Sequence, residues 1–166
     1  MSVINFAKRQ KIDVVFDAEQ EELYCDIDID QMERIMLNIL SNAIKYNKPN
    51  GNIDVIVKDR KEKVYIDVID SGIGIPKDRI NTIFDRFERM ENKNAVIKEG
   101  SGIGLSIVKK LVDALDGEIN IESEVDKGTT VRLIFKKSKN QNGIEEVYDI
   151  SQHLEEKVNL EMSDIS

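Results

Sequence analysis

The stretch Val64-Tyr-Ile-Asp-Val-Ile-Asp70-Ser-Gly-Ile-Gly74 decides the fold more than any other part of this chain. It begins as an apolar run that predicts a strand, and it ends in an acid that leads directly into a glycine-rich tetrapeptide. The same Ser-Gly-Ile-Gly returns at residues 101–104, where it precedes a helical pattern. Glycine lets the backbone adopt positive φ and approach a ligand closely. The two loops therefore predict two walls of one site for a phosphate-rich ligand.

The patterns around this stretch predict an alternation of strands and helices. We expect strands over 12–16, 23–27, 52–58, 63–70, 118–124 and 129–136, and helices over 31–46 and 104–115, with a short helix over 79–89. Asp30 is the expected N-cap of the first long helix, with Glu33 completing a capping box, and Gly117 the expected C′ residue of the second. The order predicts an α/β (α+β) two-layer sandwich, a mixed, mostly antiparallel sheet of about five strands with about three helices on one face.

Composition excludes several classes of function. The net charge of −8 over 166 residues argues against a general nucleic-acid binder. Residues 139–166 hold two lysines and seven acidic residues, so this tail carries −5 of that charge. No apolar run is long enough to span a bilayer, and the N-terminus lacks the apolar core of a signal peptide. Cys25 is the only cysteine, so no internal disulfide is possible, and a reducing cytoplasm is the expected location.

Three polar side chains share one face of the helix predicted over 31–46. Asn38, Asn42 and Lys45 follow one another at helical spacing. Amide oxygens suit Mg²⁺, which keeps several waters and takes phosphate oxygens as further ligands, and a lysine can hold a phosphate. An ordinary exposed polar helix face gives the same pattern, and spacing alone does not separate the two interpretations.

Asp70 and the second glycine loop each have two interpretations. A carboxylate at the end of a strand can accept from an exocyclic amine such as that of adenine, or can form an Asx-turn. The loop over 100–105 leads into a helix whose free N–H groups favour an anion such as a di- or triphosphate, or it is a flexible turn. It matches neither the dinucleotide fingerprint nor the P-loop pattern.

Phe84 and Phe87 stand three residues apart in a polar segment, and they predict anchors for a mobile element or ordinary core packing. Arg86 between them either reaches a phosphate or faces solvent. A nucleophilic pair of Cys25 and His153 is disfavoured, because Cys25 lies in an apolar stretch and His153 in the tail. The sequence has no cluster with zinc-ligand spacing.

Five segments in one order resemble the catalytic ATP-binding domain of bacterial sensor histidine kinases, in the GHKL ATPase superfamily. They are Asn38-Ile-Leu-Ser-Asn-Ala-Ile-Lys-Tyr46 (the N box), residues 70–74 (G1), 84–87 (F), 100–105 (G2) and Gly128-Thr-Thr130, a third small glycine box. The match covers about residues 10–137. Each box alone is weak evidence, whereas five in order are specific.

The resemblance implies roles for individual residues. Asp70 would bind the adenine amino group with Thr129 nearby through water, Asn42 would ligate Mg²⁺, and residues 76–99 would form the ATP lid. The implied catalytic residues are Asn38, Lys45 and Arg86. The implied ATP site consists of Asn38, Asn42, Lys45, Tyr46, Asp70, Gly72, Gly74, Ile75, Phe84, Phe87, Gly100, Ser101, Gly102, Ile103, Gly104, Leu105, Thr129 and Thr130.

One departure within the superfamily is informative. Its ATP-hydrolysing members carry a glutamate base where this chain has Asn38. An amide is a poor base, so the resemblance implies transfer of the γ-phosphoryl to a protein histidine, which depends mainly on positioning and charge neutralisation. A nucleotide-dependent regulatory module like the anti-sigma relatives, and an ATP-hydrolysing gate, are the alternatives.

The phospho-accepting histidine of a full sensor kinase lies upstream of this domain, whereas His153 lies downstream. We therefore expect residues 1–10 to be a linker remnant, 11–138 the ATP-binding domain and 139–166 an acidic tail. The implied partners are a dimerisation and histidine phosphotransfer domain and a response regulator. No contact with nucleic acid or membrane is expected, and the isolated domain is expected to be a monomer in the cytoplasm.

Overall fold

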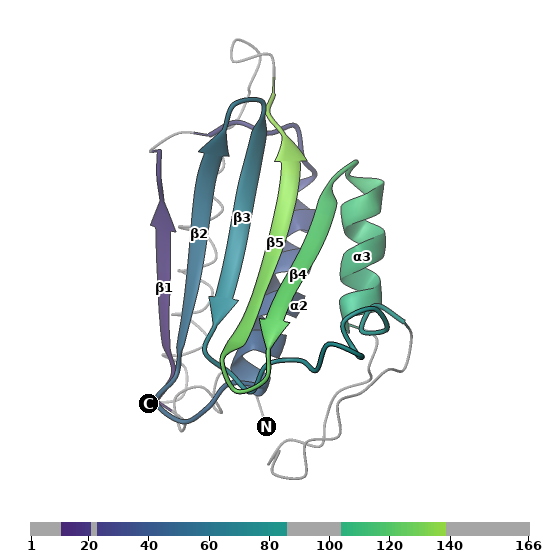
Figure 1. Ribbon diagram of the computed structural model, residues 1–166. Helices are drawn as coiled ribbons and strands as arrows, with labels where there is room; N and C mark the ends of the chain where they lie inside the picture. The colour runs from purple at the N-terminus through teal and green to yellow at the C-terminus, as the bar shows by residue number, and fades with distance from the viewer. Residues whose placement is uncertain (1–10, 21–22, 86–103, 139–166) are drawn as a thin grey trace.

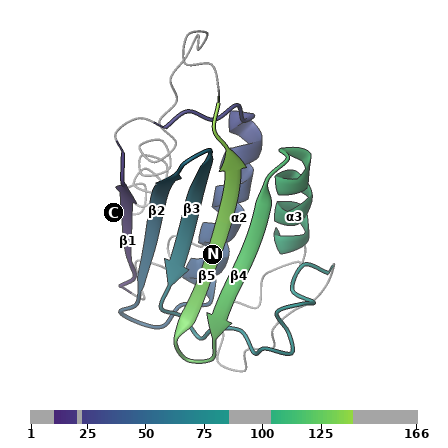
Figure 2. The same ribbon diagram turned by 45° about the horizontal axis from the view of Figure 1, so that its top comes forward.

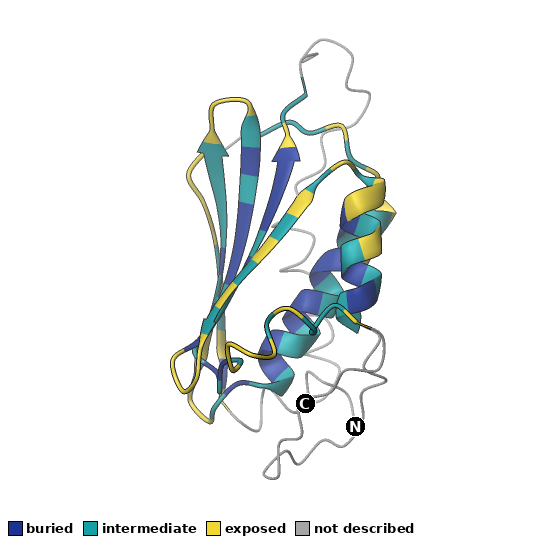
Figure 3. Cartoon of the chain, turned by 45° about the vertical axis from the view of Figure 1, so that its right-hand side comes forward, coloured by how far each residue is buried: buried dark blue, intermediate teal, exposed yellow. Residues whose placement is uncertain are grey.

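The computed structural model describes residues 11–20, 23–85 and 104–138. Within these ranges five strands form one sheet in the order β1-β2-β3-β5-β4, and two helices lie against one of its faces (Figure 1). The elements are β1 (Asp13–Ala18), α2 (Ile29–Lys45), β2 (Asn52–Arg60), β3 (Lys63–Asp70), α3 (Gly104–Ala114), β4 (Glu118–Glu124) and β5 (Gly128–Lys136). Figure 3 shows the two layers, with the buried side of each helix turned toward the sheet. The predicted mixed two-layer sandwich is confirmed.

The sheet register decides which side chains share a face. β1 runs parallel to β2, and the other neighbouring strands are antiparallel. Val64, Ile66 and Val68 of β3 are buried beneath the helices. Because side chains alternate along a strand, Asp70 lies on this same face at the end of β3. α2 packs on β3 and α3 on β4, and Figure 2 shows both helices on the same side of the sheet.

Helix α2 begins two residues earlier than predicted. Asp28, in extended conformation, is its N-cap, and its side chain accepts from the Gln31 backbone N–H at 2.9 Å. The prediction of Asp30 as N-cap is wrong, because Asp30 already lies in the first helical turn, where its charge favours the helix dipole. The predicted four-residue apolar spacing is confirmed by the buried residues of the helix, Met32, Ile35, Met36, Ile39, Leu40, Ala43 and Ile44.

Helix α3 ends in a Schellman motif whose left-handed residue is Asp116, with φ of 52°. The Gly117 N–H bonds the Val112 carbonyl at 2.9 Å, and the Asp116 N–H bonds the Asp113 carbonyl at 3.1 Å. The prediction of Gly117 as the C′ residue is therefore wrong by one position. Gly117 is needed for another reason, since a Cβ there would stand 2.5 Å from the Phe135 ring.

The predicted strand over 23–27 does not form. Leu23, Cys25 and Ile27 pack, half-buried, against the core, but this segment joins no strand of the sheet. Residues 77–84 form consecutive turns in place of the described part of the helix predicted over 79–89. No helix among the described residues is long and apolar enough to cross a membrane.

The sheet face turned away from the helices carries a buried ion cluster. Asp67 of β3 is fully buried and accepts from Arg132 Nε and Nη2 at 2.7 and 2.9 Å and from Lys58 Nζ at 2.8 Å. Burial raises the pKa of Asp67, but the hydrogen bonds and charges of Arg132 and Lys58 outweigh it and lower the pKa below its ordinary value. The cluster ties β2, β3 and β5 together on the far side from Asp70.

Candidate functional site

The candidate site begins with the carboxyl group of Asp70 at the end of β3. Its Oδ1 accepts from the Gly72 N–H at 2.8 Å, which is an Asx-turn across the first two loop residues. Burial raises the pKa of Asp70 to about 6, and the backbone N–H groups of Gly72 and Thr129 offset part of that rise. The carboxylate is thus ionised at neutral pH in a poorly solvated position, where a ligand N–H would stabilise it.

The loop over 71–75 is packed between the end of α2 and the hairpin of β4 and β5. The Ile73 N–H bonds the Tyr46 carbonyl at 3.0 Å, and a Cβ at Gly72 would stand 2.4 Å from that same oxygen. Gly74 has φ of +68°, and a Cβ there would stand 2.0 Å from the Glu124 carbonyl. Both glycines are therefore required by close backbone contact.

A buried amide that sequence reasoning missed secures one side of this loop. Asn47, just past α2, donates from Nδ2 to the Asn52 carbonyl at 3.2 Å and accepts from the Ser71 hydroxyl at 3.2 Å. Ser71 in turn accepts from the Asn52 N–H at 2.9 Å. The sequence pattern indicates only that Asn47 follows the end of a helix. The available signal was that an Asn beside a helix terminus often forms a hydrogen bond with nearby backbone.

Ser123 of β4 secures the other side of the loop, and it too was missed. Its hydroxyl oxygen accepts from the Ile75 N–H at 2.7 Å and lies 2.9 Å from the Gly128 carbonyl and 2.9 Å from the Thr129 hydroxyl. Ser123 stands opposite Thr129 in the sheet, and Thr129 stands opposite Asp70. This row is visible only once the strand register is known.

The amide face predicted on α2 turns toward the beginning of α3. Asn38 donates from Nδ2 to the Arg34 carbonyl at 2.7 Å. A Cβ at Gly104 would stand 3.1 Å from Asn38 Oδ1 and 3.9 Å from Asn42 Nδ2. Glycine at 104 thus eases the close approach of the first turn of α3 to Asn38, whereas the distance to Asn42 is an ordinary van der Waals contact. Farther along α2, Lys45 Nζ lies 5.3 Å from the centroid of the Tyr46 ring.

The structure brings the predicted residues together in two groups joined by α2. One consists of Asp70, Gly72, Gly74, Ile75 and Thr129 beside Tyr46, and the other of Asn38 and Asn42 beside Gly104. Leu105 is half-buried in the first turn of α3, and Phe84 is half-buried in the turns over 77–84. Arg86, Phe87, Gly100, Ser101, Gly102 and Ile103 lie outside the described residues, as do residues 1–10 and 139–166.

The Thr130 side chain does not join either group. Thr130 pairs with Ile69 of β3 and Glu122 of β4, one position away from the row that holds Thr129 and Asp70. Alternation along β5 places its side chain on the sheet face away from the helices. The Thr130 side chain therefore lies on the other sheet face from Asp70 and Thr129, and a role for Thr130 in nucleotide binding stays a prediction.

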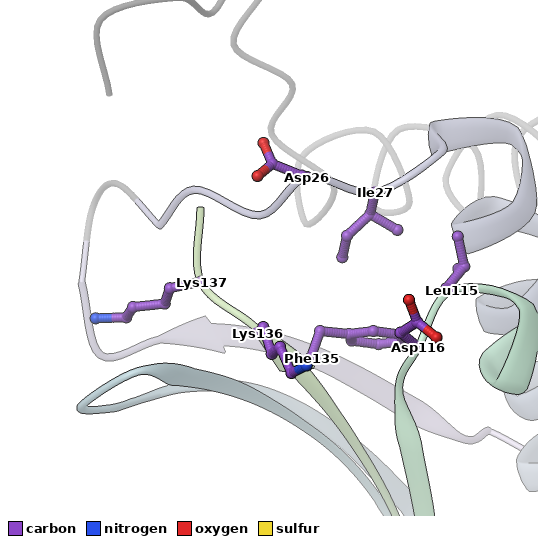
Figure 4. Close-up of a pocket in the computed structure, with 7 residues that line it drawn as sticks. All are labelled: Asp26, Ile27, Leu115, Asp116, Phe135, Lys136 and Lys137. Atoms are coloured by element: carbon purple, nitrogen blue, oxygen red, sulfur yellow. The ribbon is translucent and has the colours of Figure 1, made fainter. Parts of the chain in front are cut away.

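A cavity of about 370 Å³ lies at the other end of the sandwich (Figure 4). It is lined by Asp26, Ile27, Leu115, Asp116, Phe135, Lys136 and Lys137. Phe135 is separated from Thr129 by roughly 20 Å of strand. This cavity holds none of the predicted site residues. The described part of the chain also contains no group of three His, Cys, Asp or Glu that could hold a metal ion.

Curated relatives of this chain are sensor kinases. The sensor histidine kinase WalK of Bacillus subtilis (strain 168) is 37% identical over 126 residues, which make up 75% of this chain and 21% of WalK. The signal transduction histidine-protein kinase ArlS of Staphylococcus haemolyticus is 37% identical over 117 residues, or 70% of this chain and 26% of ArlS. The chain therefore spans much less than half the length of the curated relatives it matches.

Solved structures agree in fold. The catalytic domain of histidine kinase ThkA, in a nucleotide-free form, has a TM-score of 0.68 and 28% identity, covering 80% of this chain and 85% of that one. The mycobacterial sensor histidine kinase MprB has a TM-score of 0.68 and 25% identity, covering 81% and 93%. Both contain the sandwich described above.

A family model gives the most direct assignment. The model for the histidine kinase-, DNA gyrase B-, and HSP90-like ATPases matches residues 27–139, a range that begins just before α2 and ends after β5. It therefore includes both groups of site residues, from Asn38 to Thr129. The resemblance drawn from the five sequence boxes is confirmed, and the chain belongs to the family of histidine kinase-, DNA gyrase B- and HSP90-like ATPases.

Proposed function

We propose that this chain binds Mg·ATP and donates the γ-phosphoryl group to a histidine on a separate dimerisation and phosphoacceptor domain. The observation that carries the proposal is the pair of site groups joined by α2, an acidic base-recognition end at Asp70 of β3 and an amide end at Asn38 and Asn42 of α2. Relatives with the names of sensor histidine kinases support this choice within the family.

At the base end, Asp70 would accept a hydrogen bond from the adenine amino group. Its side chain is half-buried, and its Oδ1 is oriented by the Gly72 N–H. Thr129, directly opposite in the register, would contribute through a water. Gly72, Gly74, Ile75 and Tyr46 would form the walls, because the loop is fixed against α2 and the β4–β5 hairpin.

At the phosphate end, the amide oxygen of Asn42 would hold Mg²⁺. The residues present fit this ion, since Mg²⁺ needs few protein ligands when phosphates and waters supply the rest. Bound Mg²⁺ supplies charge neutralisation on the phosphates. Lys45, one turn farther along α2, would add a positive charge, and the N–H groups at the start of α3 would bind phosphate oxygens beside Gly104 and Leu105.

The geometry at Asn38 favours phosphoryl transfer over hydrolysis. Its side-chain N–H is already donated to the Arg34 carbonyl, and its Oδ1 faces Gly104. An amide in that position orients neighbouring groups but removes no proton from water. An ATP-hydrolysing gate therefore has no base among these residues, whereas a regulatory module that only binds nucleotide stays as the alternative.

We also propose the partners and location that follow from this role. ThkA has been solved in a complex with a response regulator, and its chain there is 26% identical with a TM-score of 0.65. If this chain acts as ThkA does, a response regulator would receive the phosphoryl group from the histidine that this chain phosphorylates. Reaction with a cytoplasmic ATP pool would place the domain in the cytoplasm.

Calorimetry with ATP, with and without Mg²⁺, followed by transfer of labelled phosphate to an added acceptor domain, tests the proposal. We expect Asn42→Ala to weaken Mg·ATP binding strongly and magnesium-free ATP binding little. Asn120→Ala, on an exposed position of β4, is the matched control. Binding without any label on the acceptor histidine would favour the regulatory module, and rapid phosphate release without acceptor would favour the hydrolytic gate.

A further inference from the structure

The hydroxyl of Ser123 makes three polar contacts at the edge of the candidate site. The Ile75 N–H lies 2.7 Å from its oxygen, the Gly128 carbonyl 2.9 Å and the Thr129 hydroxyl 2.9 Å. A serine hydroxyl has one proton and two lone pairs. Three partners therefore use its whole hydrogen-bonding capacity.

The direction of each of these bonds follows from the chemistry of the partners. The Ile75 N–H can only donate, so it occupies one lone pair of Ser123, and the Gly128 carbonyl can only accept, so it takes the proton. One lone pair is left for Thr129. The Thr129 hydroxyl must therefore donate its proton to Ser123, and its oxygen has only lone pairs to offer any other group.

This assignment matters because of where Thr129 stands. Thr129 lies directly opposite Asp70 on neighbouring strands, on the sheet face that meets the helices. The ionised Asp70 carboxylate is also an acceptor only. Both polar groups in this row would then accept, either from a ligand or from a water that donates to both.

We propose that Ser123 is a specificity-determining positioning residue, which holds the Thr129 hydroxyl as an acceptor and so favours an amino group over a keto group on the purine. The inference rests on the proposed function, because it concerns the base of the same nucleotide. An adenine amino group donates to this pair of acceptors. The keto oxygen of guanine can only accept a hydrogen bond at the same position. It would face the lone pairs of Asp70 and Thr129, or those of a water that has donated both of its protons to these two residues.

The test compares the affinities for ATP and GTP by calorimetry on the full 166-residue chain. In Ser123→Ala the Thr129 hydroxyl is free to rotate and donate to a keto oxygen, so we expect the ratio of ATP to GTP affinity to fall about tenfold. Ser123→Thr keeps the hydroxyl and should restore most of that ratio. Thr129→Val removes the hydroxyl and should itself lower the ratio.

A matched control separates this role from loop anchoring. Ser71 also holds the loop through its hydroxyl, but its partners are Asn47 and Asn52. Ser71→Ala should weaken both nucleotides by the same factor. In the Thr129→Val background, Ser123→Ala should no longer change the ratio, because the hydroxyl on which it acts is absent.

The possible outcomes separate the inference from the proposed function. If Thr129→Val leaves the ratio of ATP to GTP affinity unchanged, the inference is wrong. This outcome decides the matter even if the Ser123→Ala variant does not fold. Equal weakening of both nucleotides by Ser123→Ala would also overturn it and reduce Ser123 to an anchor. If the unaltered chain binds neither nucleotide, the proposed function itself fails.

Discussion

Replacing Asp70 with asparagine tests whether an ionised carboxylate is kept, at a cost to stability, for ligand recognition. The pKa of Asp70 is raised from 3.8 to about 6, chiefly by burial. Between these values the native state binds more protons than the unfolded chain, so stability falls as the pH rises from about 4 to about 6. Above pH 6 the free energy of unfolding stays lowered by the full amount, which is at most about 3 kcal/mol.

The variant Asp70→Asn removes the charge but keeps an oxygen that can accept from the Gly72 N–H. We therefore expect its free energy of unfolding at pH 7.5 to exceed that of the unaltered chain by about 1–3 kcal/mol. At pH 4.5 the gain should shrink to about 1 kcal/mol or less, because most native Asp70 is then protonated. Urea unfolding followed by circular dichroism at several pH values measures both quantities.

The same substitution should weaken nucleotide binding. Asparagine would present a neutral amide where, in the proposed function, the adenine amino group donates to a charged acceptor, so we expect ATP affinity to fall at least about thirtyfold. Asp17→Asn, on an exposed position of β1, removes the same charge and should change neither quantity. Lower stability of Asp70→Asn at every pH, together with unchanged ATP affinity, would refute this reasoning and leave Asp70 as a turn residue.

Three further predictions concern the same fold. Mg·ATP affinity of the unaltered chain, measured by calorimetry, should fall as the pH drops below about 6, where Asp70 becomes protonated; a flat profile would contradict the assignment. Gly74→Ala should lower the free energy of unfolding by at least about 1–3 kcal/mol from the positive φ alone. It should also weaken ATP binding, because a Cβ would stand 2.0 Å from the Glu124 carbonyl and displace the loop. A loss of stability without a loss of affinity, or the reverse, would argue against a loop fixed by both α2 and the β4–β5 hairpin. Asp67→Ala should lower the free energy of unfolding, measured in urea, by roughly 2–4 kcal/mol at pH 7 and by less as the pH falls through the lowered pKa of Asp67. ATP affinity should stay unchanged, because the buried ion cluster of Asp67 lies on the other sheet face from Asp70.

Sequence patterns predicted the sheet and both described helices because each signal was local. Alternating residues located β1, apolar runs located β2, β3, β4 and β5, and four-residue spacing located α2. The errors arose where several residues satisfy one local rule. Asp28 and Asp30 are both good N-caps, and only the backbone conformation selects Asp28. Asp116 and Gly117 can both end a helix, and the Phe135 ring decides which position needs glycine.

The candidate site also contains residues that local sequence motifs predict and residues that they do not. Asp70 and the glycines were predictable because their chemistry appears in short motifs. The sheet face taken by the Thr130 side chain, and the contacts of Ser123 and Asn47, depend on the pairing of β3, β4 and β5 and on the turn after α2. Such contacts join residues far apart in the sequence, and a single sequence without the strand register does not reveal them.

The proposed base end of the candidate site is held in place by the core of the fold. Hydrogen bonds that the loop over 71–75 donates to Tyr46, Asn47 and Ser123 hold it against elements that belong to the core. The entropy of ordering this loop is therefore lost on folding and not on binding, which favours tight binding. This separates two kinds of variant. Loss of an anchor, as in Asn47→Ala, should lower stability and affinity together. Loss of the charge proposed for base recognition at Asp70 should raise stability while lowering affinity, because burial holds that charge unfavourably in the free protein.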